Sequence, residues 1–284
     1  MSIDAAFATA TMPVPGDLDV VWTTLDGMRV YGRVSPPGTA QTDLPPVVLV
    51  HGLSVSSRYL MPAARALAPF RRVFVPDLPG FGYSQKPPHV LDLPRLADAL
   101  AAWTRAMGLE RTVFIGHSLG CQTVCNLALR HPELVEGAVL LGPTMDPRAS
   151  SWQEFFRLMV DMLLFEQPRF LGVTLLEFAH TGPWWAQRTF HYALNDDVLG
   201  KYARMHTPAL VVRGEHDPIA PARWAEELVD LLPEARPVVT VPGTGHCPHD
   251  SSPSAFLDAV LPFLSDLECE RSPLTAEVRE SGVA

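Results

Sequence analysis

Short, largely apolar runs recur along the chain. They lie at residues 47–50, 72–75, 112–115, 138–141, 209–212 and 237–241. Runs of this length without polar alternation predict strands that are buried on both faces, as in a parallel sheet. We therefore expect six such strands in the core of the protein.

Segments with apolar residues at helical spacing separate most of these runs. They cover residues 58–67, 93–107, 119–129, 221–231 and 254–267. Gly108 directly follows the second segment, where glycine commonly ends a helix. Strands that alternate with helices predict right-handed crossover connections and a largely parallel sheet with helices on both faces, which is an α/β architecture.

A β-hairpin is expected before the first buried strand. The segments 20–23 and 28–34 are rich in β-branched and apolar residues, and they flank Leu25, Asp26 and Gly27. An Asp-Gly pair between two such segments is typical of a tight hairpin turn.

Residues 147–205 break the alternation, because they contain no buried-strand run. This stretch holds 11 of the chain's 24 aromatic residues, so aromatic side chains account for much of its apolar character. They are Trp152, Phe155, Phe156, Phe165, Phe170, Phe178, Trp184, Trp185, Phe190, Tyr192 and Tyr202. A helical layer with its own core would explain this composition, and so would an apolar lid over a pocket. The two interpretations are compatible.

Composition and charge exclude several classes of protein. Of the 284 residues, 47% are hydrophobic and 19% are charged, which excludes a disordered chain. The formal net charge is −9, whereas a nucleic-acid-binding protein needs a basic surface to neutralise phosphates. No apolar run approaches the roughly 20 residues of a membrane-spanning helix, so we expect no membrane span.

The cysteines indicate a reducing compartment. Cys121, Cys125, Cys247 and Cys269 are few and irregularly spaced, so reduced thiols in a cytoplasmic protein are the simplest interpretation. Cys121 and Cys125 can share a helix face, but small buried side chains explain them better than a metal site does. Residues 1–16 lack the basic and apolar regions of a signal peptide, and we expect a flexible leader there.

A Gly-x-Ser-x-Gly motif marks the candidate nucleophile. Gly116, Ser118 and Gly120 form this motif between a predicted strand and a predicted helix. In that context the glycines permit a tight, strained turn, which holds the serine hydroxyl above the carboxyl edge of the sheet. The N-terminus of the following helix adds free N–H groups and the positive end of a dipole. A purely structural turn is the alternative.

A serine hydroxyl needs an adjacent base, and His246 is the candidate. It lies in a glycine-rich loop directly after the last predicted strand, at the same edge of the sheet as Ser118. His249 is the competitor three residues further on. His117 adjoins the serine but should point away from it, so we interpret it as a packing or supporting residue.

The base in turn needs a carboxylate that fixes its tautomer and stabilises the imidazolium. Asp217 follows the strand at 209–212, again at the carboxyl edge, and is the candidate acid. Asp146, which follows the strand at 138–141, is the alternative. The chain order serine, acid, histidine is the order of α/β architectures with this motif.

The negative oxygen of a reaction intermediate needs preorganised donors. The backbone N–H groups of Leu53 and Leu119 are the candidates, because both residues follow buried strands at the same edge. We expect His51 to stabilise its loop by hydrogen bonding rather than to act as a base. Asp77 and Gly80 are expected to shape a neighbouring turn.

Together these segments resemble the α/β-hydrolase fold superfamily. The matching segments are 51–52, 76–84, 116–120, 214–217 and 245–246. The resemblance implies an α/β fold with a mostly parallel eight-stranded sheet flanked by helices, and a helical cap inserted after strand six. It also implies an enzyme that needs no cofactor.

The resemblance also implies a division of the chain. Residues 17–143 and 207–268 would form the hydrolase core, and 144–206 the helical cap. Residues 269–284 are expected to be a flexible tail. Aromatic residues of the cap are candidate substrate contacts, namely Trp152, Phe156, Trp184 and Trp185.

The expected activity is hydrolysis of a small or medium apolar carboxylic ester or lactone through an acyl-enzyme on Ser118. The alternatives are a cofactor-free haloperoxidase-like esterase, a carbon–carbon bond hydrolase of the meta-cleavage type, and a ligand-binding sensor on the same fold. The carbon–carbon reaction would use a basic group of the cap such as Arg157, Arg169 or Arg188. We expect no metal ion, no nucleic-acid partner and a small apolar substrate; the oligomeric state is left open.

Overall fold

The structure is a computed structural model, and it describes residues 17–39, 44–166 and 168–271. The predicted leader and most of the predicted tail lie outside the described residues. The strands are β1 (Asp19–Leu25), β2 (Met28–Val34), β3 (Val47–Val50), β4 (Val73–Pro76), β5 (Thr112–His117), β6 (Val135–Leu141), β7 (Ala209–Gly214) and β8 (Ala235–Val241). The longer helices outside the inserted segment are α2 (Met61–Leu67), α3 (Leu93–Ala106), α4 (Leu119–Arg130), α9 (Ala222–Leu231) and α11 (Pro253–Arg271).

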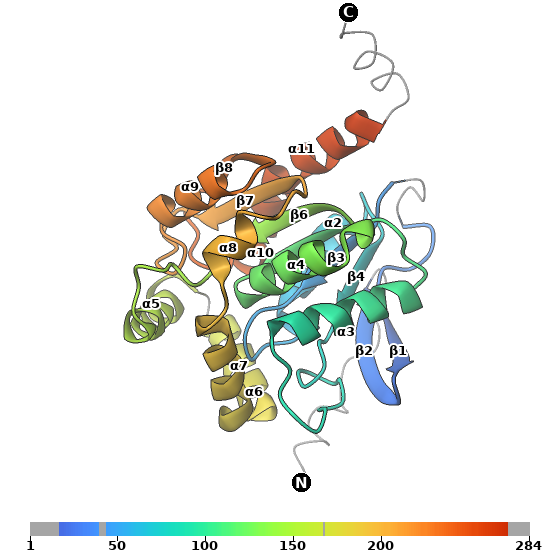
Figure 1. Cartoon of the computed structure of the whole chain (residues 1–284), viewed down its shortest axis with the longest axis horizontal. Helices are drawn as coiled ribbons and strands as arrows, with labels where there is room; N and C mark the ends of the chain where they lie inside the picture. Colours follow the sequence, from blue (N-terminus) through green and yellow to red (C-terminus); the bar gives the residue numbers. More distant parts are fainter. Residues whose placement is uncertain (1–16, 40–43, 167, 272–284) are drawn as a thin grey trace, which may run out of the picture.

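One sheet contains all eight strands, in the order β1-β2-β4-β3-β5-β6-β7-β8 (Figure 1). Strand β2 is antiparallel to both of its neighbours, and the other pairs are parallel. This confirms the predicted mostly parallel, eight-stranded α/β sheet. After β3 the chain first adds β4 on one side and then β5 on the other. Ligands of open α/β sheets bind at such a switch point, beyond the carboxyl ends of the strands.

The predicted hairpin is formed by β1 and β2. Asp26 and Gly27 both have positive φ, 48° and 79°. Two consecutive residues with positive φ are typical of the tight hairpin turn that matches strand twist. The Asp-Gly pair therefore fixes the register of the first two strands.

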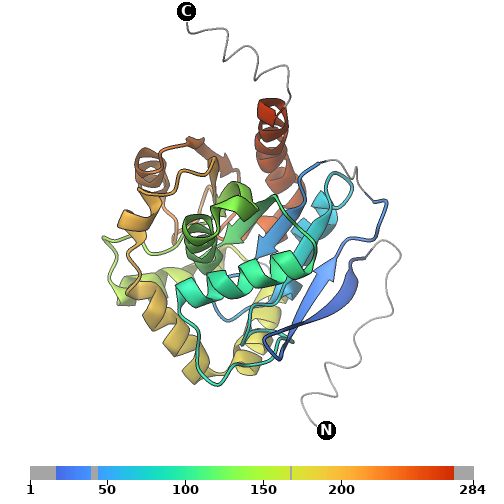
Figure 2. The ribbon, with the colours of Figure 1, turned by 45° about the vertical axis from the view of Figure 1, so that its right-hand side comes forward.

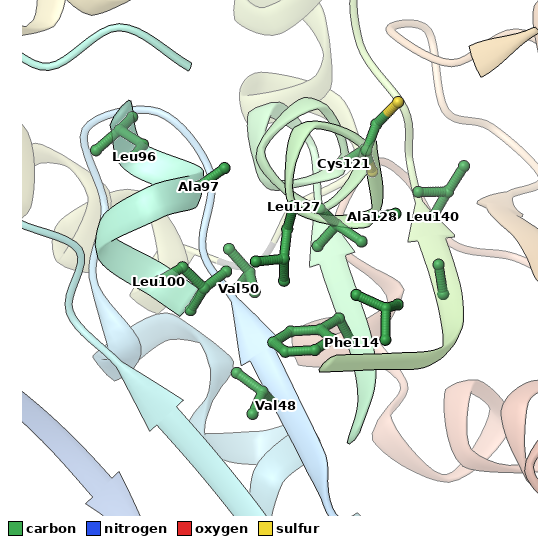
Figure 3. Packing of buried hydrophobic residues seen from close by; sticks show 14 of the residues in the cluster. Val48, Val50, Leu96, Ala97, Leu100, Phe114, Cys121, Leu127, Ala128 and Leu140 are labelled. Carbon is green, nitrogen blue, oxygen red and sulfur yellow. The ribbon is translucent and has the colours of Figure 1, made fainter. Parts of the chain in front are cut away.

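Alternate residues of the buried strands face two different cores. In β3, Val48 and Val50 belong to the core under α3 and α4, whereas Val47 and Leu49 belong to the core under α2 and α11. Figure 3 shows the first core, where Val48, Val50 and Phe114 of the sheet face α3 and α4. The view in Figure 2 shows α3 and α4 in front of the sheet. Both faces of these strands are covered, and this explains their uninterrupted apolar runs.

The helices differ from the predicted ones at their ends. The segment at 58–67 is divided into a short 3-10 helix, η1 (Ser57–Leu60), and α2. Pro62 lies in the first turn of α2. Proline suits this position because it has no N–H, and an N–H there would have no acceptor within the helix. Helix α11 continues to Arg271, three residues into the predicted tail. The four-residue helix α10 (Pro248–Ser251) was not predicted, since it is too short to show a period.

Four helices fill the aromatic-rich stretch between β6 and β7. They are α5 (Ser151–Leu164), α6 (Pro168–Thr181), α7 (Pro183–Leu194) and α8 (Val198–Tyr202). In Figure 1, α6 and α7 lie together at the lower left, away from the β1–β2 hairpin. Ala193 of α7 packs with Leu119 of α4, and Leu53 and Tyr192 border this contact. Helix α7 therefore lies against the loops at the carboxyl edge of the sheet.

None of the four cysteines forms a disulfide; Cys121, Cys125 and Cys247 are buried and Cys269 is exposed. Among the described residues, no helix combines the length and the apolar character that crossing a membrane requires.

Candidate active site

Ser118 lies in the sharp turn between β5 and α4. Its φ of 56° is in the left-handed region, which costs a non-glycine residue on the order of 1–3 kcal/mol. The surrounding structure maintains this conformation, since the N–H of Ser118 donates to the carbonyl of Leu141 in neighbouring β6 at 2.9 Å. The side chain of Ser118 remains half-buried. The turn therefore presents a single hydroxyl at the edge of the sheet.

Glycines make room for this turn. A Cβ added to Gly116 would lie 2.5 Å from the carbonyl oxygen of Gly120, and one added to Gly52 would lie 3.1 Å from Cβ of Ser118. A Cβ added to Gly120 would overlap the carbonyl oxygen of Val50 and lie 2.9 Å from that of His51. At Gly116 and Gly120 the obstructing atoms belong to the backbone, which cannot move aside as a flexible side chain can, so larger residues are excluded at these two positions.

Replacing Gly120 by alanine is expected to destabilise the protein. The added methyl group must push β3 and α4 apart, and such overpacking typically costs about 1–3 kcal/mol of unfolding free energy. Gly172 in α6 is the matched control, because its added Cβ would meet no atom within 4 Å. Gly172→Ala should leave stability unchanged or raise it by about 0.5–1 kcal/mol. Urea unfolding followed by circular dichroism measures both; equal effects of the two substitutions would contradict this role of Gly120.

His246 and Asp217 form a buried hydrogen-bonded pair. Nδ1 of His246 lies 2.9 Å from Oδ2 of Asp217, and both side chains are almost fully buried. The other carboxylate oxygen of Asp217 accepts the N–H groups of Ile219 and Ala220 at 2.8 and 2.9 Å. Burial opposes ionisation of Asp217, but His246 and these hydrogen bonds outweigh it and lower its pKa. Asp217 is therefore a fixed carboxylate aimed at Nδ1.

The opposite nitrogen of this imidazole, Nε2 of His246, is buried and has no hydrogen-bond partner among the described residues. The ring borders the end of β6, because a Cβ added to Gly142 would lie 2.9 Å from its Cε1. Ser118 is bonded to that same strand end through Leu141. The structure thus brings the carboxyl ends of β5, β6 and β7 together with the loop after β8.

A hydrogen-bonded chain connects the loop after β3 with the loop that carries His246. The N–H of Gly52 donates to the hydroxyl of Tyr59 at 2.9 Å, and this hydroxyl lies 2.7 Å from Nδ1 of His117. Nε2 of His117 lies 2.9 Å from the carbonyl oxygen of His246. Burial and the neighbouring His249 and His246 hold the pKa of His117 well below its usual range. Neutral His117 can therefore accept from Tyr59 and donate to His246.

The competing residues have other surroundings. His249 is fully buried, and its ring centroid lies 4.3 Å from that of His117. Burial and then His246 lower the pKa of His249 to about 3. Asp146 bonds to Arg223 at 2.6 Å and lies 3.5 Å from Arg157. The carboxylate that pairs with His246 is Asp217.

Hydrogen bonds of His51 hold the loop after β3. Nε2 of His51 accepts the N–H of Leu78 at 2.9 Å, and Nδ1 lies 2.9 Å from the carbonyl oxygen of Gly52. His51 is thus engaged on both sides, in agreement with a supporting role. Leu53 follows in the same loop, and Leu119 is the first residue of α4, where an N–H has no acceptor within the helix.

Asp77 organises the neighbouring turn. Its two carboxylate oxygens accept the N–H groups of Ser57 and Tyr83 at 2.7 and 2.8 Å. Gly80 has a φ of 94°, and an added Cβ there would lie 2.5 Å from the ring of Trp185 in α7. The turn predicted around Asp77 and Gly80 therefore also supports the inserted helices.

One cluster contains the residue types that bind metal ions. Ligand atoms of His117, Cys247 and His249 lie within 4.8 Å of one another, and all three residues are buried. However, both ring nitrogens of His117 are engaged, with Tyr59 and with His246. Burial and nearby carboxylates also raise the pKa of the Cys247 thiol well above its usual range. The arrangement fits a neutral packed cluster behind the site better than a metal centre.

The four aromatic residues predicted as substrate contacts have different environments. Trp152, Phe156 and Trp184 are 72%, 61% and 62% exposed. Trp185 is buried against the turn at Gly80. The side chains of Leu53, Met145 and Tyr192, which were not among the predicted substrate contacts, lie partly buried around the contact between α7 and Leu119.

Sequence reasoning also missed Asp161 and Glu166. These two buried carboxylates accept hydrogen bonds from the N–H groups of His246 and Cys247. An available sign was the pair of acidic residues at the end of an amphipathic helix that has no basic residue in its last turn. Nothing in the pattern indicated which segment they would meet.

Comparison with known proteins assigns the chain to a family. A family model described as alpha/beta hydrolase fold matches residues 45–182, and another described as TAP-like protein matches residues 181–275. The chain belongs to the α/β-hydrolase fold superfamily.

Individual relatives cover most of the chain. RutD of Pseudomonas savastanoi pv. phaseolicola, named as a proposed carbamate hydrolase, is 28% identical over 247 residues, or 78% of this chain and 95% of RutD. Esterase YbfF of Escherichia coli is 26% identical over 239 residues, or 78% of this chain and 93% of YbfF. The crystal structure of a proposed lipase from Acinetobacter baumannii shares the fold, with a TM-score of 0.77 at 21% identity over 90% of this chain and 94% of that one. The similarities to RutD and YbfF support an enzyme of the α/β-hydrolase class.

Proposed function

We propose that the protein is a serine hydrolase that cleaves a small or medium apolar carboxylic ester or lactone. The observation that carries the proposal is the buried pair of His246 and Asp217. Nε2 of His246 has no hydrogen-bond partner among the described residues, and the ring borders the end of β6, to which the strained Ser118 turn is also bonded. The names of the curated relatives, an esterase and a proposed carbamate hydrolase, agree with acyl transfer to water.

In the first half of the reaction, Ser118 attacks the acyl carbon and His246 takes the hydroxyl proton at Nε2. Asp217 keeps the proton of the neutral imidazole on Nδ1, so that Nε2 is the acceptor. The N–H groups of Leu53 and Leu119 would bind the negative oxygen of the tetrahedral intermediate. The imidazolium then returns its proton to the leaving alcohol, and the acyl-enzyme forms.

In the second half, His246 activates a water molecule that attacks the acyl-enzyme. The acid is released, and Ser118 regains its proton. The same donors serve both intermediates, because the oxygen that becomes negative occupies the same position in each. Apart from the substrate and this water molecule, the proposed chemistry uses only side chains and backbone groups of this chain.

We further propose that residues 144–206 form a cap over the substrate. The contact of α7 with Leu119 and the burial of Trp185 against Gly80 support this proposal. Partly buried Leu53, Met145 and Tyr192 are the side chains we assign to an apolar acyl group. Trp152, Phe156 and Trp184 would contact a substrate only from the solvent-exposed side of the cap, since more than half of each residue is exposed.

The carbon–carbon hydrolase alternative is less well supported. It would use a cap cation to hold a substrate carboxylate. Arg157 lies 3.5 Å from Asp146, and Arg188 bonds to the hydroxyl of Tyr192 at 3.2 Å. These two candidate cations already have partners, and an apolar ester places no such demand on the cap.

A panel of p-nitrophenyl esters tests the proposal. We expect steady turnover with acyl chains of about two to eight carbons and an initial burst of p-nitrophenol wherever deacylation is slower than acylation. An enzyme preparation without turnover on any ester would contradict the hydrolase proposal and favour the ligand-binding sensor. Saturable binding of an ester without product formation would identify that outcome directly.

A further inference from the structure

The end of α5 is bonded to the loop that carries His246. Oδ1 of Asp161, in the last turn of this helix, accepts the backbone N–H of His246 at 2.8 Å. Oε1 of Glu166, two residues beyond the helix, accepts the N–H of Cys247 at 2.9 Å. Two consecutive N–H groups of the loop after β8 that carries His246, here called the base loop, are therefore bonded to two carboxylates of the inserted segment.

Helix energetics argue against carboxylates at this place. The C-terminal end of a helix is the negative end of its dipole, which disfavours negative side chains. Both side chains are also removed from water, since Asp161 is 1% and Glu166 9% exposed. Oε2 of Glu166 has no hydrogen-bond partner among the described residues. A neutral amide would accept the same N–H group without the cost of burying a charge.

The base loop is shaped to admit these carboxylates. Gly245 precedes His246, and a Cβ added to it would lie 2.6 Å from Oδ1 of Asp161 and 2.6 Å from Cβ of Phe165. This close approach requires glycine in the loop. The contact of Asp161 and Phe165 with Gly245 is therefore part of the packing of the base loop.

We propose that Asp161 and Glu166 are positioning residues that act through His246: they anchor its loop to the inserted helices and make its imidazole a stronger base. The inference rests on the proposed function, in which His246 is the general base. It assigns to the inserted segment a part in the chemistry as well as in substrate binding.

The charges around His246 agree with this role. Burial by itself lowers the pKa of His246, but Asp217 and then Asp161 and Glu166 outweigh it and raise the pKa to about 9. His117 and His249 also face this ring, and both remain neutral because their own pKa values are lowered. The active, neutral form of His246 should therefore appear as the pH rises through about 9.

The two carboxylates are ionised over that same range. Burial is the main cause that raises the pKa of Asp161 to about 6, with Asp217 contributing in the same direction. Burial and then Asp161 raise the pKa of Glu166 to about 7, and Asp250 of α10 adds to this. Above about pH 7 both carboxylates carry charge and stabilise the imidazolium. Removing their charges should lower the pKa of His246.

The test is the pH dependence of kcat/KM for p-nitrophenyl acetate between about pH 5.5 and 10, corrected for uncatalysed hydrolysis. The variants are Asp161→Asn, Glu166→Gln and the double variant, which keep an oxygen for each N–H group but remove the charge. Glu110→Gln is the matched control, since Glu110 is an exposed carboxylate before β5, at the opposite edge of the sheet. Thermal unfolding confirms that each variant is folded.

The wild-type profile should rise with a midpoint near pH 9, and the double variant should rise about 1 pH unit lower. Each single variant should shift in the same direction by less, which keeps the test decisive if the double variant does not fold. The control should follow the wild type. Folded variants with an unshifted midpoint would overturn the inference while the hydrolase proposal stands. A wild-type protein without turnover would instead overturn the proposed function.

Discussion

The Ser118→Ala protein should bind esters but hydrolyse them at least about 10⁴-fold more slowly than the wild type. The substitution removes the oxygen that forms the acyl-enzyme. The backbone donors at Leu53 and Leu119 remain, so a small residual rate above that in buffer is expected. Steady-state kinetics with p-nitrophenyl butyrate measures this loss, which should fall on kcat rather than on KM.

Folding is not expected to suffer from this change. Alanine is about as strained as serine at a φ of 56°, and the side chain of Ser118 is only half-buried. Ser254→Ala, at an exposed serine of α11, is the control and should keep full activity. Retention of wild-type kcat in Ser118→Ala would contradict the nucleophile assignment.

Asp217→Asn should lower kcat by roughly 10³–10⁴-fold. One carboxylate oxygen of Asp217 accepts two backbone N–H groups, so the carbonyl oxygen of asparagine will take that position. The amide NH₂ then faces Nδ1 of His246 as a donor. His246 must accept at Nδ1 and carry its proton on Nε2, where it cannot take the proton of Ser118.

The matched variant is Asp146→Asn, which removes the same charge from the alternative candidate acid after β6. Asp146 is bonded to Arg223 rather than to His246, so its loss should lower stability and leave kcat close to that of the wild type. Parallel kinetics on the two asparagine variants measures the difference. A large loss in Asp146→Asn together with an active Asp217→Asn would reverse the assignment of the acid.

Much of the fold could be predicted because the relevant physics is local. Five of the six predicted strands, β3 to β7, are buried and covered on both faces, so each appears as an apolar run that needs no knowledge of its neighbours. The prediction of a buried strand was wrong for the sixth, because β8 is at the edge of the sheet and only its Val241 is buried. The Asp26-Gly27 turn depends only on the conformations those two residues can adopt. The short helices η1 and α10 could not be predicted, because each is shorter than the windows in which periodicity is visible.

The parts of the site that depend on direction could not be predicted. Asp217 and Asp146 follow neighbouring strands of the same sheet, and only the structure shows that the first faces His246 and the second faces Arg223. The contacts of Asp161 and Glu166 join residues 85 and 81 positions apart in the chain. Helical periodicity shows that a residue lies on one face of α5 but does not show what that face will meet.

Covalent labelling with a fluorophosphonate, followed by mass spectrometry of the digested protein, tests the central claim most directly. The reagent requires a serine oxygen made nucleophilic by a neighbouring base, and it leaves a stable phosphonyl group when fluoride departs. We predict one adduct per chain, on the peptide that contains Ser118, and none in the Ser118→Ala protein. An unlabelled wild-type protein, or a label on another residue, would contradict the account.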